Sequence, residues 1–148
     1  MKTVILFLGA FAFQQAIGFA GIETAIPETN RVILELGDWV PTQDETRKAL
    51  IAIGDSLNGP ELRIFEGQEK RKILRNIKNY RVQFVGTKRQ GRKIIWCNFF
   101  PADRGEKDQF ENWRREKIEV DDGGFWFWHI DYDPSTGKCE NFESNGYA

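Results

Sequence analysis

Residues 80–100 read YRVQFVGTKRQGRKIIWCNFF, and this stretch decides the fold. Apolar side chains at Tyr80, Val82 and Phe84 alternate with polar ones, and a period of two is typical of a strand with one buried face. The pair Gln90-Gly91 follows, and such a pair is typical of a two-residue hairpin turn. The stretch therefore predicts two antiparallel strands that are joined by a tight turn.

Pairing across this turn gives the two strands a core face and an opposite face. We expect the core face to carry Val82, Phe84, Ile95, Cys97 and Phe99. The opposite face of the second strand carries Ile94, Trp96, Asn98 and Phe100. Because this second set is too apolar to stay bare in water, we expect another segment of the chain to cover it.

The chain after this hairpin is predicted to continue as strands and turns. Alternating apolar residues predict strands at residues 114–120, 125–132 and 138–143. Residues 121–124 and 133–137 are rich in Asp and Gly, and such clusters predict the turns between these strands. The second half of the chain is therefore expected to form a meander of hairpins.

The chain before the hairpin predicts a helix. Thr42 and Glu45 have the spacing of a capping box, which marks the start of a helix. Apolar residues then recur at helical spacing, at Ala49, Leu50, Ile53 and Leu57. Residues 58–60 end this helix. A strand is expected at 31–36, and a short amphipathic helix with a basic outer face at 70–78. The order predicts an α+β fold, with this N-terminal helix packed on a curled antiparallel β-sheet of four to five strands.

Three segments of the chain are expected to have different roles. Residues 1–20 have a charged start, an apolar run and small residues at the end, as in a secretory signal peptide. Residues 21–30 are expected to be a flexible leader, and residues 31–148 a single domain. We therefore expect a periplasmic or secreted protein. No later segment is apolar enough to predict membrane insertion.

Composition excludes several classes of function. The chain has 21 Lys and Arg residues against 22 Asp and Glu residues, so nothing in its charge favours nucleic acid. His129 is its single histidine, which leaves too few nitrogen and sulfur ligands for a zinc site and no catalytic triad. We expect no enzyme activity, no metal and no cofactor, and we interpret His129 as a structural or surface partner of Asp131.

The two cysteines, Cys97 and Cys139, allow two interpretations. In an oxidising compartment they predict a disulfide, which is the pairing we favour. In a simple meander, however, the two residues lie three strands apart, about 14 Å, while a disulfide needs Cα atoms within about 7 Å. Either the last strand leaves the sheet edge or the cysteines remain free thiols.

The strand at 125–132 supplies the main candidate binding surface. Phe125 and Phe127 are expected to face the core, so that Trp126, Trp128 and Tyr132 point to the other side. Large rings that share a face with charged residues either are covered by another element or form a recognition surface. Both interpretations remain open from the sequence.

Four segments carry a resemblance to a known group of proteins. They are residues 80–86, residues 93–100, Val120-Asp121-Asp122-Gly123-Gly124 and the ending Asn145-Gly146-Tyr147-Ala148. With them the chain resembles small exported bacterial proteins of unknown function over residues 38–148. One helix before a meander is also similar to the cystatin-like or NTF2-like shape, in which a sheet wraps a helix.

Cystatins inhibit proteases through a hairpin with the pattern Gln-x-Val-x-Gly. The similar segment here, from Gln83 to Gly86, is one residue shorter than that pattern, and the second hairpin lacks the Pro-Trp pair. Because of this partial similarity, we add Gln83 and Gly86 to the candidate binding residues. The leading hypothesis is a non-catalytic periplasmic or secreted binding module for an unknown protein or cell-envelope ligand. The alternative is an inhibitor or immunity-type protein that acts on a secreted enzyme.

Overall fold

The computed structural model describes residues 21–60, 67–102 and 108–146 of the chain, and the predicted signal peptide lies outside these residues. Its helices are α1 (Ile22–Ala25), α2 (Gln43–Asn58) and α3 (Gly67–Asn76), with the 3-10 helices η1 (Glu28–Asn30), η2 (Ile77–Asn79) and η3 (Gly124–Trp126). Its strands are β1 (Arg31–Leu34), β2 (Tyr80–Arg89), β3 (Arg92–Pro101), β4 (Trp128–Asp133) and β5 (Lys138–Ser144). The α+β class predicted from the sequence is confirmed.

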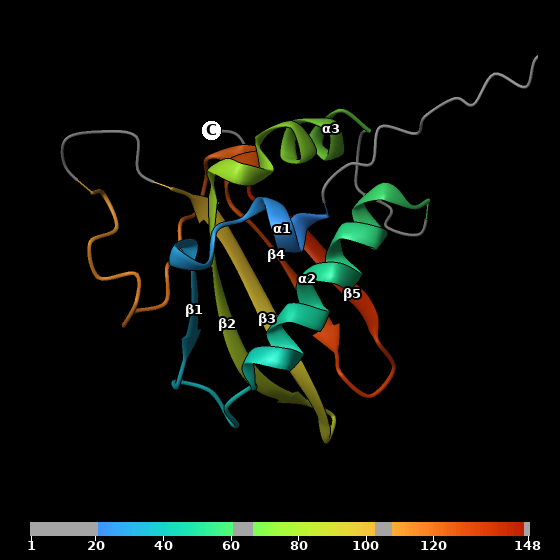
Figure 1. The fold of residues 1–148 in the computed structure, drawn as a ribbon. Coiled ribbons are helices and arrows are strands. Elements are labelled where there is room, and N and C mark those ends of the chain that lie inside the picture. The colour runs from blue at the N-terminus through green and yellow to red at the C-terminus, as the bar shows by residue number, and fades with distance from the viewer. Residues whose placement is uncertain (1–20, 61–66, 103–107, 147–148) are drawn as a thin grey trace, which may run out of the picture.

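The five strands form one sheet in the order β1-β2-β3-β4-β5. Strands β2 to β5 pair antiparallel with their neighbours, but β1 pairs parallel to β2. The expectation of a purely antiparallel sheet was therefore wrong. Between β1 and β2 the chain passes through α2 and α3 (Figure 1), and a connection of this length returns the chain to the sheet in its original direction.

The predicted hairpin is present as β2 and β3. Its turn residues Gln90 and Gly91 have φ angles of 51° and 77°, and positive φ at both positions is typical of the turn that matches the twist of the strands. The register places Phe84 opposite Cys97 and Val82 opposite Phe99. These four side chains lie in the hydrophobic core, so the predicted core face is confirmed.

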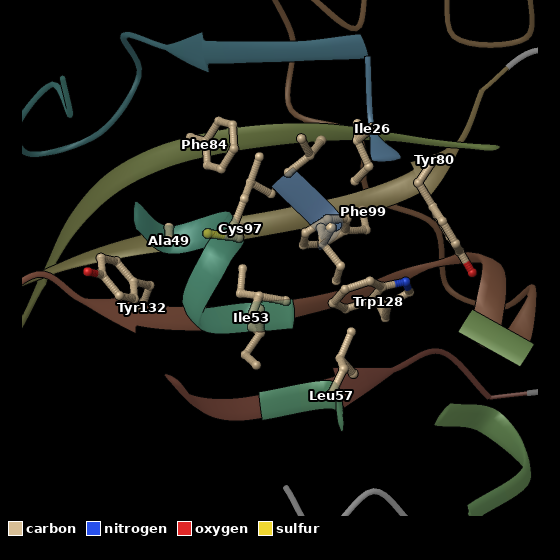
Figure 2. Close-up of a cluster of buried hydrophobic side chains, with 14 of the residues drawn as sticks. Ile26, Ala49, Ile53, Leu57, Tyr80, Phe84, Cys97, Phe99, Trp128 and Tyr132 are labelled. Carbon is tan, nitrogen blue, oxygen red and sulfur yellow. The ribbon is translucent and has the colours of Figure 1, made fainter. Parts of the chain in front are cut away.

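Helix α2 covers that core face, and the structure confirms how it starts. The Thr42 hydroxyl accepts a hydrogen bond from the Glu45 backbone N–H, and the Glu45 carboxylate accepts one from the Thr42 N–H. The four predicted stripe residues are fully buried: Ala49, Leu50, Ile53 and Leu57. Figure 2 shows three of them, Ala49, Ile53 and Leu57, among the rings of the sheet. The space between α2 and the sheet is therefore filled by apolar side chains.

Residues 21–30 differ from the flexible leader expected from the sequence. They form α1 and η1, and Ile22 and Ile26 are buried in the core. Helix α1 lies against α2 at Gly54, where a Cβ atom would be 3.4 Å from the Ile22 backbone nitrogen. A segment of ten residues with only a few apolar side chains has no clear helical period, so its packing against α2 was not visible in the sequence.

Residues 114–120 differ from the predicted strand. They form turns and irregular chain that lies over the outer face of the sheet, the face opposite α2. We call residues 113–120 the covering segment. The buried Gln83 amide donates to the carbonyls of Trp113 and Glu116 and accepts from the Ile118 N–H. Because these side-chain bonds satisfy the backbone, the segment needs no neighbouring strand. The expectation that something covers the outer face of β3 is confirmed.

The predicted disulfide is absent, and Cys97 and Cys139 are free thiols. Cys97 lies on β3 opposite Ile130 of β4, and Cys139 lies on β5 opposite Tyr132 of β4. One strand therefore separates the cysteines, and they are offset by two residues along it, which together correspond to about 12 Å between their backbones. This distance exceeds the reach of a disulfide.

Among the described helices, none has the length and apolar character needed to cross a bilayer.

We expect Gln83→Met to lower the free energy of unfolding by about 3 kcal/mol, because a side chain of similar size would leave several buried backbone groups without partners. The measurement is urea unfolding followed by tryptophan fluorescence.

Gln43→Met is the matched control, because Gln43 is exposed in the first turn of α2. It should change the free energy of unfolding by less than about 0.5 kcal/mol. Equal losses in the two variants would show that the Gln83 amide does not hold the covering segment.

Candidate functional site

The residues predicted to form a binding surface are mostly buried. Trp128 is 1% exposed, Tyr132 5% and Gln83 0%, and Figure 2 shows both rings inside the core. Gly86 lies in the middle of β2 beneath Trp39, where a Cβ atom would be 2.2 Å from the Trp39 carbonyl oxygen. The segment from Gln83 to Gly86 is therefore no protruding hairpin. The four buried candidates, Trp128, Tyr132, Gln83 and Gly86, offer no surface to a partner.

The faces of the aromatic strand are exchanged relative to the prediction. The 3-10 helix η3 occupies Gly124–Trp126, and β4 begins only at Trp128. As a result Trp128 faces the core, where its ring stacks on Phe99 at 3.8 Å, while Phe127 packs edge-on against Phe110. Trp126 is partly buried and packs against Tyr80. A shift of one residue moves every side chain of a strand to the other face.

A cleft of about 390 Å³ opens on the outer face of the sheet, between the covering segment and strands β3 and β4. Its lining combines aromatic rings, amides and carboxylates: Trp96, Phe127, His129, Asn98, Asn145, Glu119 and Asp121. Sites for small ligands commonly combine aromatic walls with a few polar groups that fix orientation. The sequence predicted one of the lining residues, Trp128, as a contact, but its side chain lies in the core.

Trp96 is the central ring of this outer cleft. It lies on β3, and its ring is 5.4 Å from the imidazole of His129 on β4, at an angle of 43°. The ammonium of Lys117 lies 4.3 Å from the centre of the Trp96 ring, which is the geometry of a cation–π contact. The same ammonium forms an ion pair with Glu119. The covering segment therefore places one cation over the Trp96 ring and one carboxylate, Glu119, next to that cation.

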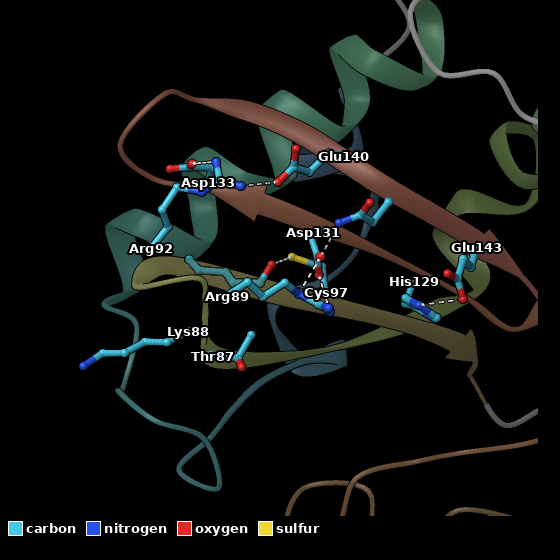
Figure 3. A network of polar contacts seen from close by, with 12 residues as sticks. Thr87, Lys88, Arg89, Arg92, Cys97, His129, Asp131, Asp133, Glu140 and Glu143 are labelled. Carbon is cyan, nitrogen blue, oxygen red and sulfur yellow. Dashed lines mark hydrogen bonds and ion pairs between the residues drawn. The ribbon is translucent and has the colours of Figure 1, made fainter.

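His129 lies at the wall of the cleft next to Glu143 of β5. Its Nε2 is 3.5 Å from the Glu143 carboxylate (Figure 3), and not Asp131 but Glu143 is its charged neighbour. Burial lowers the pKa of His129 below its ordinary value of 6.5, and Lys117 and Arg89 lower it further. Glu143 and Asp131 act in the opposite direction without reversing the shift. The imidazole is therefore neutral at neutral pH.

The two arginines at the tip of the β2–β3 hairpin form ion pairs within the molecule. Figure 3 shows Arg89 beside Asp131 and Arg92 beside Asp133, each pair at 2.9 Å. Arg92 also pairs with Glu140 of β5. Hydrogen bonds from Ser135, more than the charge of Arg92, lower the pKa of Asp133. The tip thus joins the two hairpins and presents less free positive charge than its sequence suggests.

The cysteines do not supply a nucleophile. Burial raises the pKa of Cys97 well above its ordinary value and that of Cys139 to about 11. Both thiols are protonated at neutral pH, and a protonated thiol is a poor nucleophile and metal ligand. Within the described ranges, no three His, Cys, Asp or Glu side chains are grouped so that they can hold a metal ion.

A second and larger groove, of about 600 Å³, lies beside β1 and the start of α2. Its two arginines are engaged within the molecule. The Arg31 guanidinium donates to the carbonyls of Glu23 and Ile26, and Arg47 pairs with Asp44. Phe84 is its one aromatic lining residue. The outer cleft is therefore the stronger candidate, because several aromatic rings line it together with two carboxylates, Glu119 and Asp121.

Because His129 is the only histidine of the chain, its titration can be followed directly by NMR of the ring protons. We expect a midpoint below 6.5. The unfolded chain then binds a proton before the folded one does, so stability contributed at this site is lost as the pH falls below about 6.5.

Accordingly, the wild type should lose more free energy of unfolding between pH 7.5 and pH 5.5 than His129→Gln, by at most about 1.4 kcal/mol per pH unit. Urea unfolding at the two pH values measures this difference. A titration midpoint at or above 6.5 in the folded protein would contradict the assignment.

Comparison of the chain with protein-family models, with curated proteins and with solved structures found no match. The resemblance to small exported bacterial proteins therefore stays an expectation from the sequence. The evidence for a function comes from the geometry of the outer cleft and from the charges around it.

Proposed function

We propose that the protein is a non-catalytic binding module of the periplasm or the extracellular space, and that the outer cleft is its ligand site. The observation that carries the proposal is the half-buried Trp96 ring, which lines the cleft. His129 lies beside it on the neighbouring strand β4, and Lys117 of the covering segment lies over its face. An aromatic ring with polar neighbours on a rigid sheet is a common way to hold a small ligand.

The absence of a reactive group in the cleft supports binding over catalysis. The carboxylates of the cleft, at Glu119 and Asp121, are exposed to water, whereas a catalytic acid or base usually stands in a buried or strongly charged surrounding. The other side of the sheet, where an NTF2-like enzyme holds its substrate, is filled by the α2 stripe.

The finer description of the fold also belongs to this proposal. A helix against a five-stranded sheet supports the cystatin-like or NTF2-like shape, and the parallel β1 departs from it. The alternative function, an inhibitor or immunity-type protein, requires an exposed contact loop. The buried position of Gln83 and Gly86 removes the loop that resembled a cystatin contact, so this alternative receives less support.

A fragment screen by NMR tests the proposal. Small neutral, anionic and cationic compounds are added to the protein, and the ring signals of His129 and the indole N–H signals are followed. We expect some compounds to shift the signals of His129 and Trp96 together, and we expect Trp96→Leu to weaken their binding at least tenfold.

Trp39→Leu is the matched control, because Trp39 is a second partly buried tryptophan with a lysine, Lys93, 4.9 Å from its ring centre. Binding should survive this change. The cleft would be excluded as the site if every binding compound shifted only signals of the groove beside β1, or if no compound shifted the signals of the outer cleft.

A further inference from the structure

The chain itself places a cation over the Trp96 ring that lines the outer cleft. The Lys117 ammonium lies over the face of Trp96 and contacts the Glu119 carboxylate at the same time. An aromatic face attracts a cation within about 6 Å of its centre, and a carboxylate beside it adds a direct charge attraction. This pair of groups is therefore built to hold a positively charged nitrogen.

The lysine is held weakly enough to be replaced. Its side chain is 41% exposed and that of Glu119 is 70% exposed. Ion pairs with this exposure contribute little to stability, because water screens them and long side chains lose freedom when they are fixed. Lys117 also belongs to the irregular part of the covering segment, between the anchored residues Glu116 and Ile118. Its side chain can leave the ring while the backbone stays in place.

The rest of the cleft favours a positive guest over a negative one. Glu119 and Asp121 line it, and Glu143 lies behind His129. The rings of Phe127 and His129 supply further walls, and the imidazole adds no positive charge at neutral pH. When Lys117 swings away, the site retains aromatic faces and carboxylates that attract cations.

We infer that the outer cleft binds an organic ligand through an ammonium group, which takes the place of Lys117 on the Trp96 ring next to Glu119. This inference rests on the proposed function of the cleft and adds the chemical class of its ligand. Lys117 then acts as an internal competitor that keeps the aromatic face covered when no ligand is present.

The test uses choline and its uncharged isostere 3,3-dimethyl-1-butanol, which differ in one charge and have nearly the same shape. Each is titrated into the protein while the His129 ring signals and the Trp96 indole signal are followed. We expect choline to shift both signals with saturation and the isostere to bind at least tenfold more weakly. Choline should also lower the pKa of His129, because a bound cation opposes its protonation.

Two lysine variants separate displacement from a general effect of charge. Lys117→Gln should bind choline at least threefold more tightly than the wild type, because the competitor is removed. Lys88→Gln changes the net charge equally at the exposed hairpin tip, and it should bind choline as the wild type does.

The outcomes distinguish the inference from the proposed function. Equal binding of choline and the isostere, or preferential binding of acetate, would overturn the ammonium class while the cleft remains a binding site. The ammonium class would also be overturned if choline shifted no signal while other fragments shifted the signals of the cleft. Failure of every compound at the cleft would overturn both. A wild-type affinity in Lys117→Gln would exclude the competition by Lys117.

Discussion

The buried amide of Gln83 is the interaction on which the outer half of the molecule depends. Its nitrogen donates to two carbonyls of the covering segment, and its oxygen accepts from the Ile118 N–H and from the Asn98 side chain. A buried polar group stabilises a structure only when its partners are present, and here one side chain meets that condition on all sides. The amide therefore fixes where Lys117 and Glu119 stand relative to the sheet.

The two faces of the sheet have divided roles because they are covered in different ways. On the inner face, α1 and α2 bring aliphatic side chains that interdigitate with the rings of β2, β3 and β4, and a close-packed interior leaves little room for a ligand. On the outer face, an irregular segment is held by hydrogen bonds to side chains and covers the strands incompletely. A cleft forms where that cover ends, on the side of the sheet opposite α2.

Local patterns predicted the elements that depend on neighbouring residues. The turn at Gln90-Gly91, the capping box at Thr42 and the stripe on α2 each follow from a few consecutive positions, and all three were confirmed. The direction of β1 was not predictable, because a period of two identifies a strand and says nothing about the direction of its partner. Tertiary hydrogen bonds decided the form of residues 114–120, and alternation alone cannot reveal such bonds.

The outer cleft was only partly predictable for the same reason. The aromatic residues of the last strands suggested either a covered face or a recognition surface, and the 3-10 helix η3 exchanged the faces on which the rings of β4 lie. Trp96 was expected on the outer face, and a covering segment was expected above it. That a gap remains beside Trp96, with Lys117 and His129 around it, depends on contacts between residues more than 20 positions apart. His129 was interpreted as a partner of Asp131, so it did not mark the cleft either.

The packing of α1 has a consequence for how the molecule can be handled. Ile22 and Ile26 fill the core within six residues of the predicted processing point, so the amino end of the domain is a structural element and not a tether. A chain shortened to begin after Ile26 would lose two buried side chains and leave a void against α2. Fusion partners at this end need a spacer long enough to leave α1 undisturbed.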